Sequence, residues 1–106
     1  MDRIERIEKM EARLRHAEEV LGRFGTALEE YEAVQEEIRE LDDYYGSETW
    51  YRDLAEDEAG RLPKELLRGV LSEDGIYDLL TENDRLRKRM AEIADESAGR
   101  QVKNEE

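Results

Sequence analysis

The stretch IERIEKMEARLRHAEEVLGRFGTALEEYEAVQEEIREL, residues 4–41, decides the fold. Its apolar residues recur at steps of three or four from Ile4 to Leu41, and the pattern continues to Tyr45. This spacing places them on one face of an α-helix, and from Met10 to Tyr31 it follows the alternation of a heptad seam. Because the stretch holds no proline, we expect one helix over residues 2–44, about 65 Å long.

Helix-ending and helix-starting residues follow this stretch. Gly46 suits the left-handed position that ends a helix, and Ser47 suits the N-cap of the next one. We therefore expect a short helix over residues 48–58. Pro63 is well placed to open a further turn over residues 63–68.

The last helix is expected over residues 73–97, with Ser72 as its N-cap. Asn83 lies on its apolar stripe, where a polar residue can fix the register of a helix pair. The other members of that stripe are Ile76, Leu79, Leu80, Leu86, Met90 and Ile93. Residues 97–106 carry no periodic apolar pattern, which predicts a flexible tail after a single domain over residues 1–96.

The predicted fold class is all-α. A long N-terminal helix folds antiparallel against a long C-terminal helix through a short helical corner, as in a coiled-coil-like helical hairpin. Charge supports this arrangement, because the basic run Arg85–Arg89 would lie near the glutamates of residues 29–37. Such intramolecular pairing is a better explanation of the run than nucleic-acid binding.

The first helix is longer than the last, so its N-terminal turns lack a partner within one chain. The apolar residues left over are Ile4, Ile7, Met10 and Leu14. An apolar surface of this kind is typical of an association face. We therefore expect a homodimer in which the first helices pair.

Composition excludes several classes of protein. The chain has 106 residues, no cysteine and a net charge of −13, which excludes disulfide frameworks, zinc fingers and thiol nucleophiles. Neither a transmembrane segment nor a signal peptide is expected, which predicts a soluble, cytoplasmic protein. The acidity argues against a nucleic-acid partner, and no membrane partner is expected. Most of it falls in residues 42–84, with 4 basic and 13 acidic residues.

Within this acidic segment, residues 42–53 hold four of the seven aromatic residues: Tyr44, Tyr45, Trp50 and Tyr51. One interpretation is a small aromatic core that pins the corner. The other is a partner site, because tyrosine and tryptophan are common at interfaces. Asp42, Asp43, Arg68 and Tyr77 complete the set of candidate partner-binding residues, and Arg68 is also expected to pair with nearby acids.

No catalytic, cofactor or metal residues are predicted. His16, the only histidine, lies off the apolar stripe and is expected on the surface. Asp42-Asp43 and Glu56–Glu58 would hold a cation only if the fold brought them together. The favoured function is a non-enzymatic interaction or scaffold module. The alternatives are an acidic inhibitor or nucleic-acid mimic that binds a basic protein, and a metal-dependent hydrolase.

The run YYGSETWYRDLAEDEAGRLPKELLRGVLSEDGIYDLLTEN, residues 44–83, resembles the bacterial domain-of-unknown-function family numbered 4298. The mixed motif GRLPKELLRGVLSED carries most of the resemblance, which extends over roughly residues 1–93. It implies a small bacterial intracellular protein. It implies no activity, cofactor or catalytic residue.

Overall fold

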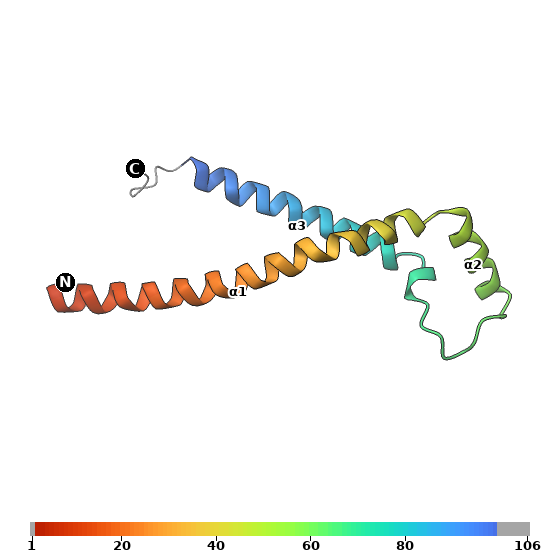
Figure 1. Cartoon of the computed structure of the whole chain (residues 1–106), viewed down its shortest axis with the longest axis horizontal. Helices are drawn as coiled ribbons and strands as arrows, with labels where there is room; N and C mark the ends of the chain where they lie inside the picture. Colours follow the sequence, from red (N-terminus) through yellow and green to blue (C-terminus); the bar gives the residue numbers. More distant parts are fainter. Residues whose placement is uncertain (1, 100–106) are drawn as a thin grey trace. The chain divides into compact units, whose positions relative to one another are not determined.

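The computed structural model describes residues 2–99, apart from the side chain of residue 98, and this part of the chain is helical without strands (Figure 1). Helix α1 spans Arg3–Tyr44, α2 spans Glu48–Glu58 and α3 spans Gly75–Ala98, with a 3-10 turn, η1, at Gly69–Leu71. The predicted all-α class, with two long helices joined by a short helical corner, is confirmed. Most of the expected C-terminal tail lies outside the described residues.

The chain divides into two compact units, residues 1–37 and residues 38–106. The first consists of the N-terminal part of α1. The second contains the last turns of α1, then α2, η1 and α3, and it holds all three buried apolar residues of the described chain: Trp50, Leu71 and Ile76.

A reciprocal pair of hydrogen bonds opens α1. The carboxylate of Asp2 accepts from the backbone N–H of Glu5 at 2.8 Å, and the Glu5 carboxylate accepts from the backbone N–H of Asp2 at 3.3 Å. This is a capping box, which satisfies donors that the first helical turn leaves unpaired. The helix then runs without interruption through Gly22 and Gly25, so the two glycines do not break it.

Glycine and serine mark the boundaries of α2. Gly46, with a φ of +80°, lies between α1 and α2, and the Ser47 hydroxyl accepts from the Trp50 N–H at 3.1 Å, as predicted for an N-cap. Gly60 has a φ of +72°. Around it, Arg61 N–H donates to the Glu56 carbonyl and Gly60 N–H to the Asp57 carbonyl, which is a Schellman ending.

The start of α3 differs from the prediction. The helix begins at Gly75, with Asp74 at the N-cap position and no side-chain cap from it. Ser72, the predicted cap, lies two residues before Asp74. Its hydroxyl donates to the Gly69 carbonyl at 2.7 Å and accepts from the Gly75 N–H at 3.0 Å. Ser72 therefore joins η1 to the first turn of α3, and η1 itself was not predicted.

Candidate functional site

Trp50 is the centre of the corner, defined here as residues 41–79. Its side chain is buried, and its ring meets those of Tyr45 and Tyr51 edge to face, with centroids 5.2 and 5.0 Å apart. The indole Nε1 donates to the carbonyl oxygen of Val70 at 2.9 Å. Trp50 thus contributes both apolar burial and a satisfied polar group, which makes it a core residue of the corner.

The two tyrosines at the end of α1 are half-buried and bond to different elements. Tyr44 donates to the carboxylate of Asp53 in α2 at 2.5 Å. This hydrogen bond, with partial burial and the negative charge of Asp53, raises the pKa of Tyr44 to about 12. Tyr45 donates to the carbonyl oxygen of Glu73, just before α3, at 3.5 Å. Together the pair ties the end of α1 to the two following helices.

Arg68 holds the segment between α2 and η1. Its guanidinium pairs with the half-buried carboxylate of Asp57 in α2. It also donates to the carbonyl oxygens of Pro63 at 3.3 Å and Lys64 at 3.2 Å. The predicted pairing of Arg68 with a nearby acid is present, and it fixes the loop that Pro63 opens.

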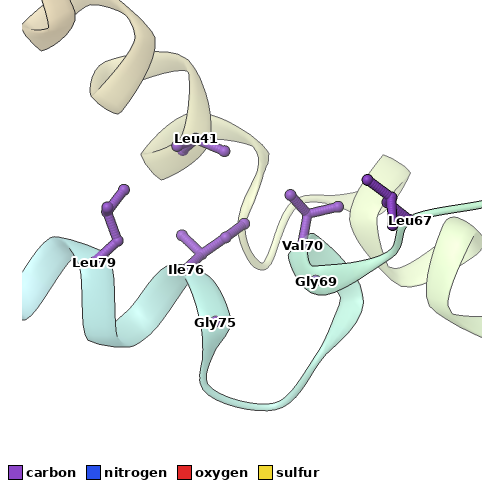
Figure 2. A pocket seen from close by; sticks show the side chains of 7 residues that line it. All are labelled: Leu41, Leu67, Gly69, Val70, Gly75, Ile76 and Leu79. Carbon is purple, nitrogen blue, oxygen red and sulfur yellow. The ribbon is translucent and has the colours of Figure 1, made fainter.

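Beside this core lies an open apolar groove of about 380 Å³ (Figure 2). Ile76 and Leu79 project from α3 toward Leu41 at the end of α1. The full lining comprises Leu41, Leu67, Gly69, Val70, Gly75, Ile76 and Leu79. The lining side chains are all aliphatic, so the groove fits an apolar side chain, and its lining offers no side chain for acid–base or nucleophilic chemistry.

Gly75 allows η1 and α3 to approach each other at one end of the groove. A Cβ built on Gly75 would collide with the carbonyl oxygen of Gly69 and would lie 2.6 Å from the Ser72 hydroxyl. Glycine at this position therefore permits the close contact between the 3-10 turn and the helix.

Carboxylates are adjacent in the sequence to several residues of the groove. Asp42 follows the lining residue Leu41, Asp74 precedes Gly75, and Asp78 precedes Leu79. All three are exposed, as is Asp43. The groove residues therefore belong to a part of the chain that is rich in exposed acids.

The predicted partner-binding residues separate into two groups. Trp50, Tyr44, Tyr45 and Arg68 hold the corner together through the contacts described above. Tyr51 and Tyr77 are exposed, with exposed fractions of 60% and 58%. Asp42 and Asp43 join them at the surface. The structure thus uses the first group in contacts within the corner, where Trp50 and Tyr45 touch each other, and leaves the second group accessible.

Sequence reasoning missed the groove because its aliphatic residues were assigned to helix stripes or to a turn. A signal was present in the run LLRGVL, residues 66–71, which has four apolar residues in and directly after the turn predicted over residues 63–68. Only Leu71 of these is buried, and Leu67 has an exposed fraction of 93%. A turn that holds more apolar residues than it can bury exposes an apolar surface, which is typical of an interaction site.

The second candidate surface is the apolar stripe of α1 in residues 1–37. No residue described in α1 is buried. The predicted self-association residues are exposed, with fractions of 65% for Ile4 and 52% for Leu14, and Leu21 reaches 67%. The other exposed members are Ile7, Met10, Val20, Phe24, Leu28 and Val34.

The ion pairs of α3 form within that helix. In α3, Arg85 bonds to Glu82 at 2.7 Å and lowers the pKa of that carboxyl, while Lys88 pairs with Asp84. Arg89 pairs with Glu92. The pairing of Arg85–Arg89 with acids of the first helix stays a prediction.

The titratable residues that the sequence singled out do not form a metal site in residues 2–99. His16 is exposed. This part of the chain contains no group of three or more histidine, aspartate or glutamate side chains that could hold a metal ion. Neither Asp42-Asp43 nor Glu56–Glu58 therefore forms a cation site with a third ligand there. In the same residues, none of the helices combines the length and apolar character needed to cross a bilayer.

The fold and its surfaces define a small all-helical protein with an exposed N-terminal helix stripe and a tied helical corner. The chain belongs to the family described as Domain of unknown function (DUF4298), whose sequence profile matches residues 7–93. The resemblance seen in the sequence is therefore confirmed. No match was found among curated proteins or among solved structures.

Proposed function

We propose that this protein is a non-enzymatic interaction module that forms a homodimer through the apolar stripe of α1. The observation that carries the proposal is the exposure of that stripe in residues 1–37, where a regular heptad spacing has no buried member. A helix held only by its own backbone hydrogen bonds is marginal in water. Burying each large apolar side chain against a second copy contributes about 1.5–3 kcal/mol, which stabilises the helix.

The concentration dependence of helix content tests this proposal. Far-ultraviolet circular dichroism of the wild type should show more helix, and a higher melting temperature, as the protein concentration rises. Leu21→Asp should abolish that dependence, since it places a charge on the stripe. Leu67→Asp is the matched control, because Leu67 is exposed outside α1. Helix content that is independent of concentration in the wild type contradicts the proposal.

The corner is proposed as the place where a different protein binds. The apolar groove, whose residues alternate in the sequence with exposed carboxylates, favours a partner segment that has an apolar side chain flanked by lysine or arginine. This joins the scaffold hypothesis to the alternative of an acidic inhibitor or mimic that binds a basic surface. The groove is the specific observation that favours this combined hypothesis. An acidic surface alone would bind a partner through charge and would not need an apolar groove.

Capture of host proteins on the immobilised chain distinguishes these possibilities. Leu79→Asp should release a partner that uses the groove, whereas Tyr51→Ser should release one that uses the exposed aromatic face. Release by moderate salt, with Leu79→Asp still binding, would instead support the charge mimic. Bacterial origin and a cytoplasmic location belong to this proposal too, and subcellular fractionation of the host tests the location.

A further inference from the structure

We infer that the α1 dimer is a parallel, in-register, two-stranded coiled coil over residues 7–31. This inference rests on the proposed function, since it specifies how the second copy lies against the stripe. Three observations support it: the heptad positions, the charges that flank them, and the space beside Phe24.

The heptad positions are fixed by the strict alternation in this segment. Counting Ile7 as position a places Leu14, Leu21 and Leu28 at a as well. Position d is then occupied by Met10, Ala17, Phe24 and Tyr31. Leucine or isoleucine at every a position, on an uninterrupted helix, gives a continuous seam of three and a half heptads.

The flanking positions carry opposite charges at the N-terminal end of the seam. Arg6 and Arg13 occupy position g, while Glu11 and Glu18 occupy position e. In a parallel dimer a g residue faces the e residue of the next heptad on the partner helix. Arg6 therefore meets the second copy's Glu11, and Arg13 meets its Glu18, and two-fold symmetry repeats each pair.

An antiparallel dimer loses these pairs. It places g opposite g and e opposite e, so that the arginines would face Ala27 and Val34. At position e, Glu18 would face its own copy, and Glu11 would face Gly25. Like charges placed opposite each other disfavour that orientation.

The side chains needed for the parallel pairs are accessible. Among the described residues Arg6, Arg13 and Glu18 form no ion pair. Glu11 pairs with Arg15 at 3.4 Å, but both side chains are more than half exposed, and such a pair is weak. Glu11 can therefore turn to a second copy at little cost.

The middle of the seam also suits the parallel arrangement. Val20 occupies position g and is exposed, with a fraction of 40%, and Gly25 occupies position e. The parallel register puts Val20 against the second copy's Gly25. A Cβ on Gly25 would meet nothing within 4 Å in the single chain, so this position offers room beside Phe24 for a side chain of the second copy.

Single-cysteine crosslinking tests the orientation, because the natural chain has no cysteine. Met10→Cys and Leu28→Cys are oxidised in a glutathione buffer, separately and as a mixture, and are resolved on non-reducing gels. A parallel in-register dimer crosslinks each variant to itself. An antiparallel dimer over the same residues brings position 10 opposite position 28, so that only the mixture would crosslink.

Light scattering on the wild type tests whether a dimer forms, separately from the orientation of its helices. A dimer in which Met10→Cys and Leu28→Cys each crosslink alone supports the inference. A dimer that crosslinks only in the mixture, or not at all, overturns the inference and leaves the proposed function standing. A wild-type monomer overturns both.

Charge exchange is an independent measurement in which the seam stays intact. Arg6→Glu with Arg13→Glu should raise the dissociation constant of the dimer at least about fivefold, since four attractive pairs become repulsive. Adding Glu11→Arg and Glu18→Arg should restore it. If the variant with all four substitutions associates no more tightly than the variant with two, the parallel register is wrong.

Discussion

The indole nitrogen of Trp50 donates a 2.9 Å hydrogen bond to the carbonyl oxygen of Val70, twenty residues further along the chain. Val70 belongs to η1, so this bond connects α2 directly to the turn that precedes α3. The corner is built on this connection, because the same ring also contacts Tyr45 and Tyr51.

Replacement of Trp50 should therefore destabilise the residue 38–99 part of the chain. Trp50→Ala is expected to cost about 3–5 kcal/mol, because it removes a large buried ring. Trp50→Phe should cost about 1–2 kcal/mol, since the Val70 carbonyl loses its donor. Urea unfolding followed by circular dichroism measures both. A Trp50→Ala protein with wild-type stability would show that the corner has another core.

Tyr44 should make stability depend on alkaline pH. Its folded pKa is raised from 10.0 to about 12, so the fold favours the protonated hydroxyl. That contribution is complete below pH 10 and is lost as the pH rises from 10 to about 12. Tyr44→Phe should remove this loss, and ultraviolet titration of the variant should lack the highest tyrosinate step. Tyr77→Phe, at an exposed site, is the control and should leave that step in place.

Arg68 should stabilise the loop between α2 and η1. Arg68→Ala loses the ion pair with Asp57 and two hydrogen bonds to carbonyls, and we expect a loss of about 1–2 kcal/mol. Amide hydrogen exchange should increase over residues 61–68. Arg61→Ala is the control, because the Arg61–Glu56 pair is exposed and should contribute little. Equal effects of the two substitutions would contradict the role given to Arg68.

Two glycines should respond in opposite directions to the same substitution. Gly75→Ala introduces a Cβ that collides with the Gly69 carbonyl, and we expect a loss of about 1–3 kcal/mol. Gly22→Ala meets nothing within 4 Å in the middle of α1 and should stabilise that helix by about 0.5–1 kcal/mol. Thermal unfolding of both variants measures the contrast. Stabilisation by Gly75→Ala would show that η1 and α3 are not in close contact.

Much of the fold could be predicted from local sequence patterns. The recurrence of apolar residues at steps of three or four over residues 4–41 and the absence of proline were enough for α1, and Ser47 marked the start of α2 correctly. These features depend on residues within one or two turns of each other. The start of α3 could not be predicted in this way. Ser72 bonds to Gly69 as well as to Gly75, because it caps the end of η1.

The candidate site was predicted only in part, for a similar reason. Aromatic composition drew attention to Trp50, but its burial depends on Val70 and Leu71, which lie some twenty residues away. The groove needs Leu41 and Leu79 to approach each other across the corner, and no local pattern specifies that contact. The apolar stripe of α1, in contrast, could be predicted from periodicity alone. The structure adds that the side chains of this stripe are exposed.

The most direct test of the account is the molar mass of the full chain in solution, measured by light scattering over a range of concentrations. We predict a mass that rises toward twice the chain mass of 12.5 kDa, and a Leu21→Asp variant that stays at the single-chain value. A wild-type mass equal to one chain at the highest concentrations would contradict the central claim that the stripe of α1 binds a second copy.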